Sequence, residues 1–154
     1  MSLQSSSHFI KFILAGLMFF STGERSGGVG VGGKLERALM DGRERTTIVS
    51  TSIVFPHGVA VDAPNRWGPS DPMPGTYYNR ACPRRVYWVD SLDQQLDHIA
   101  RCDYNGENRK TVFRSTPVEN LYGLTVFQNL LFLPSWKEKS IIRRNKFQPS
   151  NLTV

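Results

Sequence analysis

The sequence predicts an all-β fold built from repeated, four-stranded antiparallel units. A phrase of 15 residues occurs twice, at 34–48 and at 98–112, and each copy leads to a Gly-apolar-x-apolar step. The candidate strands are short and rich in β-branched residues, and the chain's 13 Gly and 9 Pro favour turns over long helices. Self-similarity of this kind indicates a repeat architecture. The two copies match in register at Arg37/Arg101, Gly42/Gly106, Arg45/Arg109, Thr47/Thr111 and Ile48/Val112.

The first unit follows a Ser-rich segment, 1–11, which has no hydrophobic period and predicts a disordered polar tail. An apolar run predicts a strand at 13–20, and the Gly-rich stretch 23–33 predicts a flexible loop. Asp41-Gly42 supplies a hairpin turn between two of the next strands. These strands are expected at 35–40, 46–50 and 58–62.

The second unit is separated from the first by an interval at 67–84 that has no period and contains four prolines. This composition predicts an inserted surface loop. The segment after the last strand, 148–154, is expected to be a C-terminal tail. Strands are expected to resume at 85–90, 97–102, 110–114, 123–127, 130–133 and 140–145.

The repeat length indicates which architecture the units build. Gly58 and Gly123 are 65 positions apart, or 47 when the interval 67–84 is set aside. A four-stranded blade of a β-propeller has about 40–45 residues. Residues 12–147 are therefore predicted to form part of an antiparallel β-propeller.

The charge distribution argues against a nucleic-acid partner. The net charge is +6 and the pI is near 9.6, but the basic residues alternate with 13 acidic ones. No series of base-stacking aromatic residues accompanies them. A mixed, solvated surface is the better interpretation.

The two cysteines do not form a disulfide framework. Cys102 occupies the position that Ala38 fills in the first copy, which predicts a small buried residue. A bridge between Cys82 and Cys102 is the alternative if the chain is secreted. Asn151 begins the single N-glycosylation sequon, close to the end of the chain.

The apolar run at 12–20 has two interpretations. It resembles a short signal-peptide core, since Lys11 precedes it and small residues follow it. It is too short to span a bilayer. A strand is the favoured interpretation, because 17–20 falls where later copies have other apolar strand residues.

A specific set of motifs occurs in order: the strand 85–90, a strand carrying Arg101, Asn105-Gly106 and the segment 121–127. Together they resemble the class B, or YWTD, repeats of the low-density lipoprotein receptor family, and most closely those of its large receptor-related members. The resemblance covers about 16–147. It implies a six-bladed β-propeller in an endocytic receptor, of which this chain holds about two and a half blades.

The resemblance implies a structural role for the blade motif. Trp88 is expected to pack between blades, and Asp90 to accept hydrogen bonds from neighbouring main chain or from an arginine such as Arg101. The other copies depart from the motif, with Phe20-Ser-Thr22 and Leu133-Pro-Ser135 at the corresponding places. The expected motif residues are Tyr87, Trp88, Asp90, Arg101, Gly106 and Gly123.

The resulting interpretation is a non-enzymatic fragment of a receptor ectodomain, with a scaffolding or protein-interaction role in ligand uptake and release. Implied partners are protein or lipoprotein ligands and neighbouring receptor modules, with no cofactor and no membrane span. The implied location is the extracellular side of the cell surface or endosome, or secretion if 1–23 is a signal peptide. The alternatives are a secreted β-propeller hydrolase fragment and a truncated gene product without independent function.

Other chemical motifs are weaker. The glycines at 28–33 match G-x-G-x-x-G but lack the preceding strand and the following acid of a dinucleotide site. His57 has no convergent nucleophile or carboxylate pair, although an imidazole can titrate at endosomal pH. No metal site is predicted, because the candidate calcium ligands stand singly along the chain: Asp41, Asp62, Asp90 and Asp103.

Overall fold

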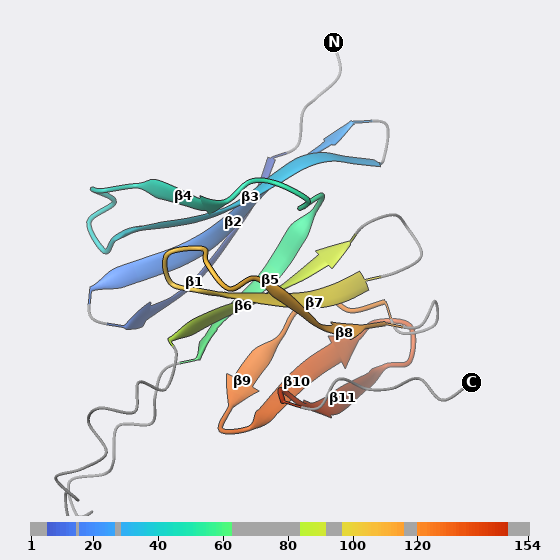
Figure 1. The fold of residues 1–154 in the computed structure, drawn as a ribbon. Helices are drawn as coiled ribbons and strands as arrows, with labels where there is room; N and C mark the ends of the chain where they lie inside the picture. Colours follow the sequence, from blue (N-terminus) through green and yellow to red (C-terminus); the bar gives the residue numbers. More distant parts are fainter. Residues whose placement is uncertain are drawn as a thin grey trace, which may run out of the picture.

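The computed structural model describes residues 6–14, 16–26, 29–62, 84–91, 97–115 and 120–147, with only the backbone described at 6–14, 24–26 and 29–31. These residues form three antiparallel sheets that follow one another along the chain (Figure 1). The first sheet contains β1 (Ser6–Leu14), β2 (Leu17–Ser26), β3 (Val29–Leu39) and β4 (Thr46–Val49). The second contains β5 (Pro56–Asp62), β6 (Arg85–Ser91), β7 (Asp97–Asp103) and β8 (Lys110–Arg114). The third contains β9 (Thr125–Phe127), β10 (Leu130–Ser135) and β11 (Ser140–Asn145).

The order of strands within each sheet follows the order of the chain, so each sheet is a simple meander. The first strands of the sheets, β1, β5 and β9, approach one another, and β5 contacts both of the others. The sheets are therefore arranged as successive blades around one side, which is the architecture of a partial β-propeller (Figure 1). This confirms the predicted fold class.

Each sheet packs face to face against the next through apolar side chains. One buried cluster fills the space between the first and second sheets, which we call the first junction. A second cluster fills the space between the second and third sheets, the second junction. Adjacent residues of β6 serve different junctions, because successive side chains of a strand point to opposite faces: Trp88 enters the first and Tyr87 the second.

The amino-terminal region differs from the sequence prediction. β1 begins in the segment expected to be a disordered tail, 1–11, and continues into the strand expected at 13–20, which a turn at Gly16 divides. The stretch expected to be a loop at 23–33 instead extends β2 and β3 into a hairpin, in which Gly23 pairs with Gly33. Pairing of this kind uses main-chain groups and requires no apolar pattern, so the composition gave no signal for it.

The remaining predicted strands are confirmed, including those over the two copies of the repeated phrase. β3 and β7 occupy the places where helices would have contradicted the repeat. Apart from Arg84, the insertion at 67–84 lies outside the described residues, as does the C-terminal tail 148–154.

The inner strands of the second and third sheets meet backbone to backbone. Gly58 has φ of 58°, and a Cβ built on it would lie 2.5 Å from the Cα of Gly123. Only glycine accommodates both the left-handed conformation and this close approach. Gly58 therefore permits the close approach of the two blades, whereas a Cβ on Gly123 would meet nothing closer than the Pro134 Cγ at 4.0 Å.

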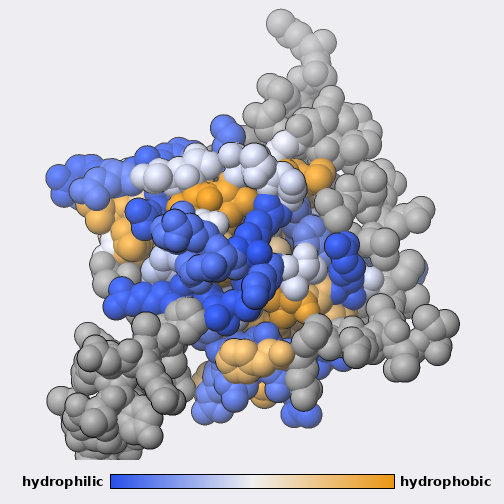
Figure 2. All heavy atoms as spheres, viewed as in Figure 1, coloured by the Kyte–Doolittle hydropathy of each residue, from blue (hydrophilic) through white to orange (hydrophobic). Residues whose placement is uncertain are grey.

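Polar side chains cover much of the face seen in Figure 2, where apolar side chains are visible beside the first sheet and over the third sheet. Most of the large hydrophobic residues that are exposed belong to β9–β11 and its adjoining turns: Tyr122, Phe127, Trp136, Ile141 and Phe147.

Candidate functional site

The first junction is built around Trp88, whose side chain is fully buried. Phe19 of β2 and Leu35 of β3 pack toward it from the first sheet. Phe19 also contacts Tyr104, with ring centroids 4.7 Å apart. Burial of large apolar side chains of this size stabilises a fold by about 1.5–3 kcal/mol each. Trp88 thus lies in the apolar cluster between the first and second sheets.

Asp90 fastens the end of β6 to the connection between β4 and β5. Its Oδ1 accepts hydrogen bonds from the amide nitrogens of Val54 (3.1 Å) and Phe55 (2.8 Å). The carboxylate is fully buried, and hydrogen bonds to an ionised acceptor are roughly twice as strong as neutral ones. Of the two partners proposed for Asp90, the structure shows main chain, and Arg101 makes no hydrogen bond to it among the contacts described.

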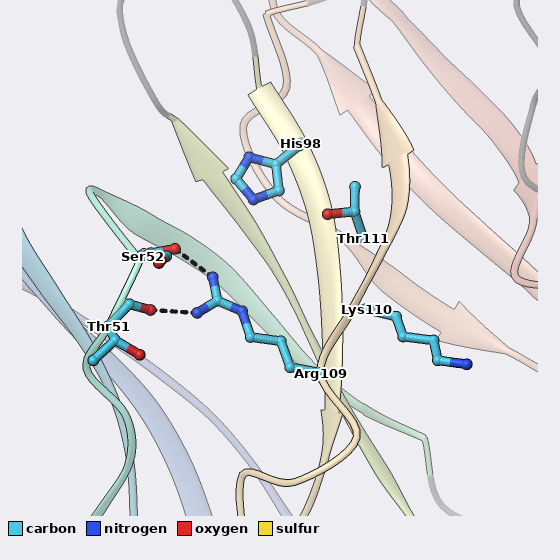
Figure 3. A pocket seen from close by; sticks show the side chains of 6 residues that line it. All are labelled: Thr51, Ser52, His98, Arg109, Lys110 and Thr111. Carbon is cyan, nitrogen blue, oxygen red and sulfur yellow. Dashed lines mark hydrogen bonds between the residues drawn. The ribbon is translucent and has the colours of Figure 1, made fainter.

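Arg109 fastens the same connection from the opposite direction. Its guanidinium donates hydrogen bonds to the carbonyl oxygens of Thr51 and Ser52 (Figure 3). Its Cζ lies 5.4 Å from the Trp88 ring centroid. The turn that carries Arg109 comes so close to the first sheet that a Cβ on Gly106 would collide with the Ile48 carbonyl. Side chains of the second sheet therefore hold both the amides and the carbonyls of the connection between β4 and β5.

An open pocket of about 520 Å³ lies beside this contact. His98 and Thr111 border it on the side of the second sheet, whereas Lys110 points away from the other side chains (Figure 3). The His98 side chain is buried, with Nε2 3.9 Å from Asp90 Oδ2 and no described hydrogen-bond partner for Nδ1. Burial lowers the pKa of His98 below its ordinary value, so the imidazole is neutral at neutral pH.

Asp97 performs the equivalent task at the second junction. Its Oδ2 accepts a hydrogen bond of 2.6 Å from the amide of Leu121, at the entrance to the third sheet, and its Oδ1 accepts one of 2.5 Å from Ser91 Oγ. In the third copy of the motif, Ser135 replaces the carboxylate. The sequence analysis missed Asp97, because this residue lies outside the repeated motif. The serine at position 135, where the motif has a carboxylate, was the available sign that another residue must accept the hydrogen bond.

A buried polar chain runs from Asp97 through Ser91 to His57. His57 Nε2 lies 2.8 Å from Ser91 Oγ, and Ser91 donates its own proton to Asp97. With that proton committed, His57 must donate to Ser91 rather than accept from it. The serine proton is held by a carboxylate and not by the imidazole, so this arrangement differs from the Ser-His-Asp geometry of hydrolases.

The other predicted motif residues are distributed over the junctions. Tyr87 is fully buried in the second junction, and its hydroxyl has no described partner. Arg101 lies on β7, half-buried. Cys102 is a free thiol in the first junction, where burial raises its pKa to about 12. Cys82 and Asn151 lie outside the described residues, so the bridge and the glycosylation site remain predictions there.

The described ranges contain no group of three or more His, Cys, Asp or Glu side chains placed to hold a metal ion. In the same part of the chain, no helix has the length and apolar character needed to cross a bilayer.

The fold and the junctions define part of an antiparallel β-propeller with blades fastened by buried carboxylates and an arginine. No family model matches the chain. The chain is similar to the sortilin-related receptors of Mus musculus (27% identity) and Oryctolagus cuniculus (26%), in each case over 118 residues. The match covers 77% of this chain and 4% of each receptor, so the chain spans a small part of those relatives.

Among solved structures, a crystal structure of a nidogen/laminin complex matches with a TM-score of 0.39 and 15% identity. That match covers 84% of this chain and 72% of the other.

Proposed function

We propose that this chain forms part of the extracellular propeller of an endocytic receptor of the lipoprotein-receptor type, where it acts without catalysis as a scaffold and protein-contact surface. The supporting observation is the junction chemistry: the carboxylates of Asp90 and Asp97 both accept hydrogen bonds from main chain that connects two successive sheets, the first to the second at Phe55 and the second to the third at Leu121. Carboxylates committed in this way hold blades together and are withdrawn from acid–base chemistry. The similarity to a receptor supports the same function.

The proposed contact surface for a partner is the pair Tyr122 and Trp136. Their ring centroids lie 5.9 Å apart, yet the residues are 65% and 74% exposed. The Tyr122 amide donates a hydrogen bond to the Pro134 carbonyl, and the Trp136 amide donates one to the Asn120 carbonyl. These main-chain contacts hold both residues at one end of the third sheet. Fixed, exposed aromatic side chains are enriched at protein–protein contacts. The partner proposed for this surface is a protein or lipoprotein ligand, or a neighbouring receptor module.

Antibody feeding tests the proposed location. Cells that make the protein with an epitope tag are exposed to antibody without permeabilisation, and the antibody is then followed into endosomes and back to the surface. Surface labelling with internalisation is the expected result. A tag detected only after permeabilisation, with no release into the medium, would overturn the proposal.

A hydrolysis assay tests the absence of catalysis. Purified protein is analysed for bound metal and incubated with ester and lactone substrates with and without added divalent cations. We expect no turnover above buffer. Metal-dependent turnover that disappears with a chelator would contradict a non-enzymatic role.

A further inference from the structure

The outward face of the first sheet, on the side away from the second sheet, repeats an arrangement that the second sheet uses at the first junction. Phe20 occupies the place of Trp88, and Arg45 that of Arg109. Arg45 Cζ lies 5.1 Å from the Phe20 ring centroid, and Arg109 Cζ lies 5.4 Å from that of Trp88. Both blades therefore place an arginine over an aromatic ring on the same face.

The two arginines differ in what they bind. Arg109 donates to carbonyl oxygens of the preceding sheet, across a junction. Arg45 donates to Glu36 within its own sheet, through Nε to Oε1 (3.0 Å) and Nη2 to Oε2 (2.7 Å). Glu36 stands where the second copy has Ala100, a buried residue of the first junction. The carboxylate thus supplies the acceptors that another blade supplies to Arg109.

Other features of this face also favour hydrogen bonding within the first sheet over hydrogen bonding to another blade. Thr22 replaces Asp90 in the first copy and donates its hydroxyl to Glu36 Oε2 at 3.4 Å, so the face lacks the acceptor for amides of a neighbouring blade. Phe20 is 7% exposed and Glu36 6% exposed beneath these contacts. Hydrogen bonding to Arg45 lowers the pKa of Glu36, which keeps the carboxylate ionised at neutral pH.

The opposite end of the chain presents an open face. Leu133 and Ile142 of the third sheet point into the second junction, so by alternation the residues next to them point outward. Ile141 is 70% exposed, and Phe127 on β9 is 58% exposed. Phe132 occupies the place of Tyr87, the residue that the third sheet covers in the second junction. This face corresponds to the faces of the first and second sheets that pack against the next sheet along the chain.

We propose that the outward face of the third sheet fits the outward face of the first sheet of a second copy of this chain, and that the Glu36–Arg45 pair keeps this head-to-tail contact from forming. At each internal junction, one sheet presents the face that corresponds to the outward face of the third sheet, and the next sheet presents the face that corresponds to the outward face of the first. Glu36 is already buried beneath Arg45, so if Arg45 turned to carbonyl oxygens of an incoming blade, as Arg109 does at the first junction, the carboxylate would be left buried and unpaired, which is strongly unfavourable. A head-to-tail contact between two different faces produces a closed ring if the rotation between copies closes, and an open chain of copies if it does not.

Replacement of Glu36 by alanine, the residue at the equivalent position 100, tests the proposal directly. Sedimentation velocity across a concentration series is expected to show a monomeric wild-type chain. The Glu36→Ala variant is expected to form concentration-dependent oligomers with at least about tenfold tighter self-association. Glu107→Ala removes a negative charge from an exposed turn and is expected to behave as wild type.

Two further variants determine whether the faces named above are responsible. Ile141→Lys, added to Glu36→Ala, is expected to return the protein to a monomer. The exchange Glu36→Arg with Arg45→Glu restores an ion pair of opposite orientation and is expected to remain monomeric. Oligomers that persist with Ile141→Lys, or a wild-type chain that already forms the same oligomers, would overturn the proposal.

Circular dichroism of each variant establishes that the β fold is retained. If Glu36→Ala does not fold, Glu36→Gln decides, because the amide keeps a hydrogen-bond acceptor for Arg45 but removes the charge. Oligomers of Glu36→Gln that Ile141→Lys abolishes support the proposal. A folded, monomeric alanine or glutamine variant contradicts it.

Discussion

Arg109 lies over the face of Trp88, with its Cζ 5.4 Å from the ring centroid, while its nitrogens hold carbonyl oxygens of the neighbouring sheet. The arginine therefore joins two blades, because it contacts an aromatic ring of its own sheet and main-chain carbonyls on the side of the neighbouring sheet. A planar guanidinium meets both demands, whereas an ammonium group is a compact point charge.

Replacing Arg109 by lysine is expected to weaken the first junction. Lysine keeps the charge but loses the fork that donates to two carbonyl oxygens at once. We expect a loss of about 1–2 kcal/mol in the free energy of unfolding, measured by urea denaturation. Lys110→Arg, at the adjacent exposed position, is the control. Equal stability of Arg109→Lys and wild type would show that the fork contributes nothing to the junction.

Removal of the Asp90 carboxylate is expected to be more damaging. Asp90→Ala leaves the amides of Val54 and Phe55 without their acceptor, at a cost of about 2–4 kcal/mol. Asp90→Asn retains one acceptor oxygen and is expected to lose less. Chemical denaturation of the three proteins gives this order directly. A similar stability for the alanine and asparagine variants would contradict the proposed role of the acceptor.

Asp97 and Ser91 are expected to act together at the second junction. A double-mutant cycle of Asp97→Ala and Ser91→Ala is expected to give a coupling free energy of about 1 kcal/mol, because their side chains share a hydrogen bond of 2.5 Å. Asp97→Ala alone is expected to cost more than Ser91→Ala, since it also removes the acceptor for the Leu121 amide. Additive effects of the two substitutions would argue against the shared hydrogen bond.

The buried imidazole of His98 predicts loss of stability in acid. Burial lowers its pKa in the folded chain below the ordinary value of 6.5, so the unfolded chain binds a proton more readily. The stability is complete above pH 6.5 and falls as the pH decreases below that value toward the folded-state pKa. Melting temperatures from pH 7.5 to 5 are expected to fall for wild type and to fall less for His98→Gln. Identical profiles would exclude His98 as the source.

The Cys102 thiol is expected to be unreactive in the folded protein. Its pKa of about 12 leaves almost no thiolate at pH 8, and the side chain is buried in the first junction. Mass spectrometry after iodoacetamide treatment is expected to show an unmodified Cys102 in buffer and a modified one in denaturant. Rapid modification of Cys102 in the native protein would indicate that the junction opens.

The sequence predicted the repeat because the features that define it are local. Turn glycines such as Gly42 and Gly106 and the alternation of apolar residues recur in register, and both follow from backbone conformation within a single unit. The expectation that Trp88 packs between blades came instead from the resemblance to the class B repeats. Strand pairing in 6–14 and 23–33 was missed, because main-chain pairing leaves little trace in composition.

The junction contacts were less predictable because they join distant parts of the chain. Asp97 reaches Leu121, and Arg109 reaches Thr51, across connections of different length. A repeated arginine indicates an equivalent position but not its partner: Arg45 and Arg109 share a register and bind different acceptors. Partner choice depends on neighbouring residues, here Glu36 in one copy and Ala100 in the other.

The contact between Gly58 and Gly123 has a consequence for how such blades diverge over evolution. Where main chain touches main chain, the spacing of two blades is fixed by the thickness of the backbone and is independent of side-chain volume. Trp88 and Leu133 occupy equivalent places despite their difference in size. Substitutions farther out, such as the change from Trp88 in one blade to Leu133 in the next, are therefore expected to leave the backbone spacing at Gly58 unchanged.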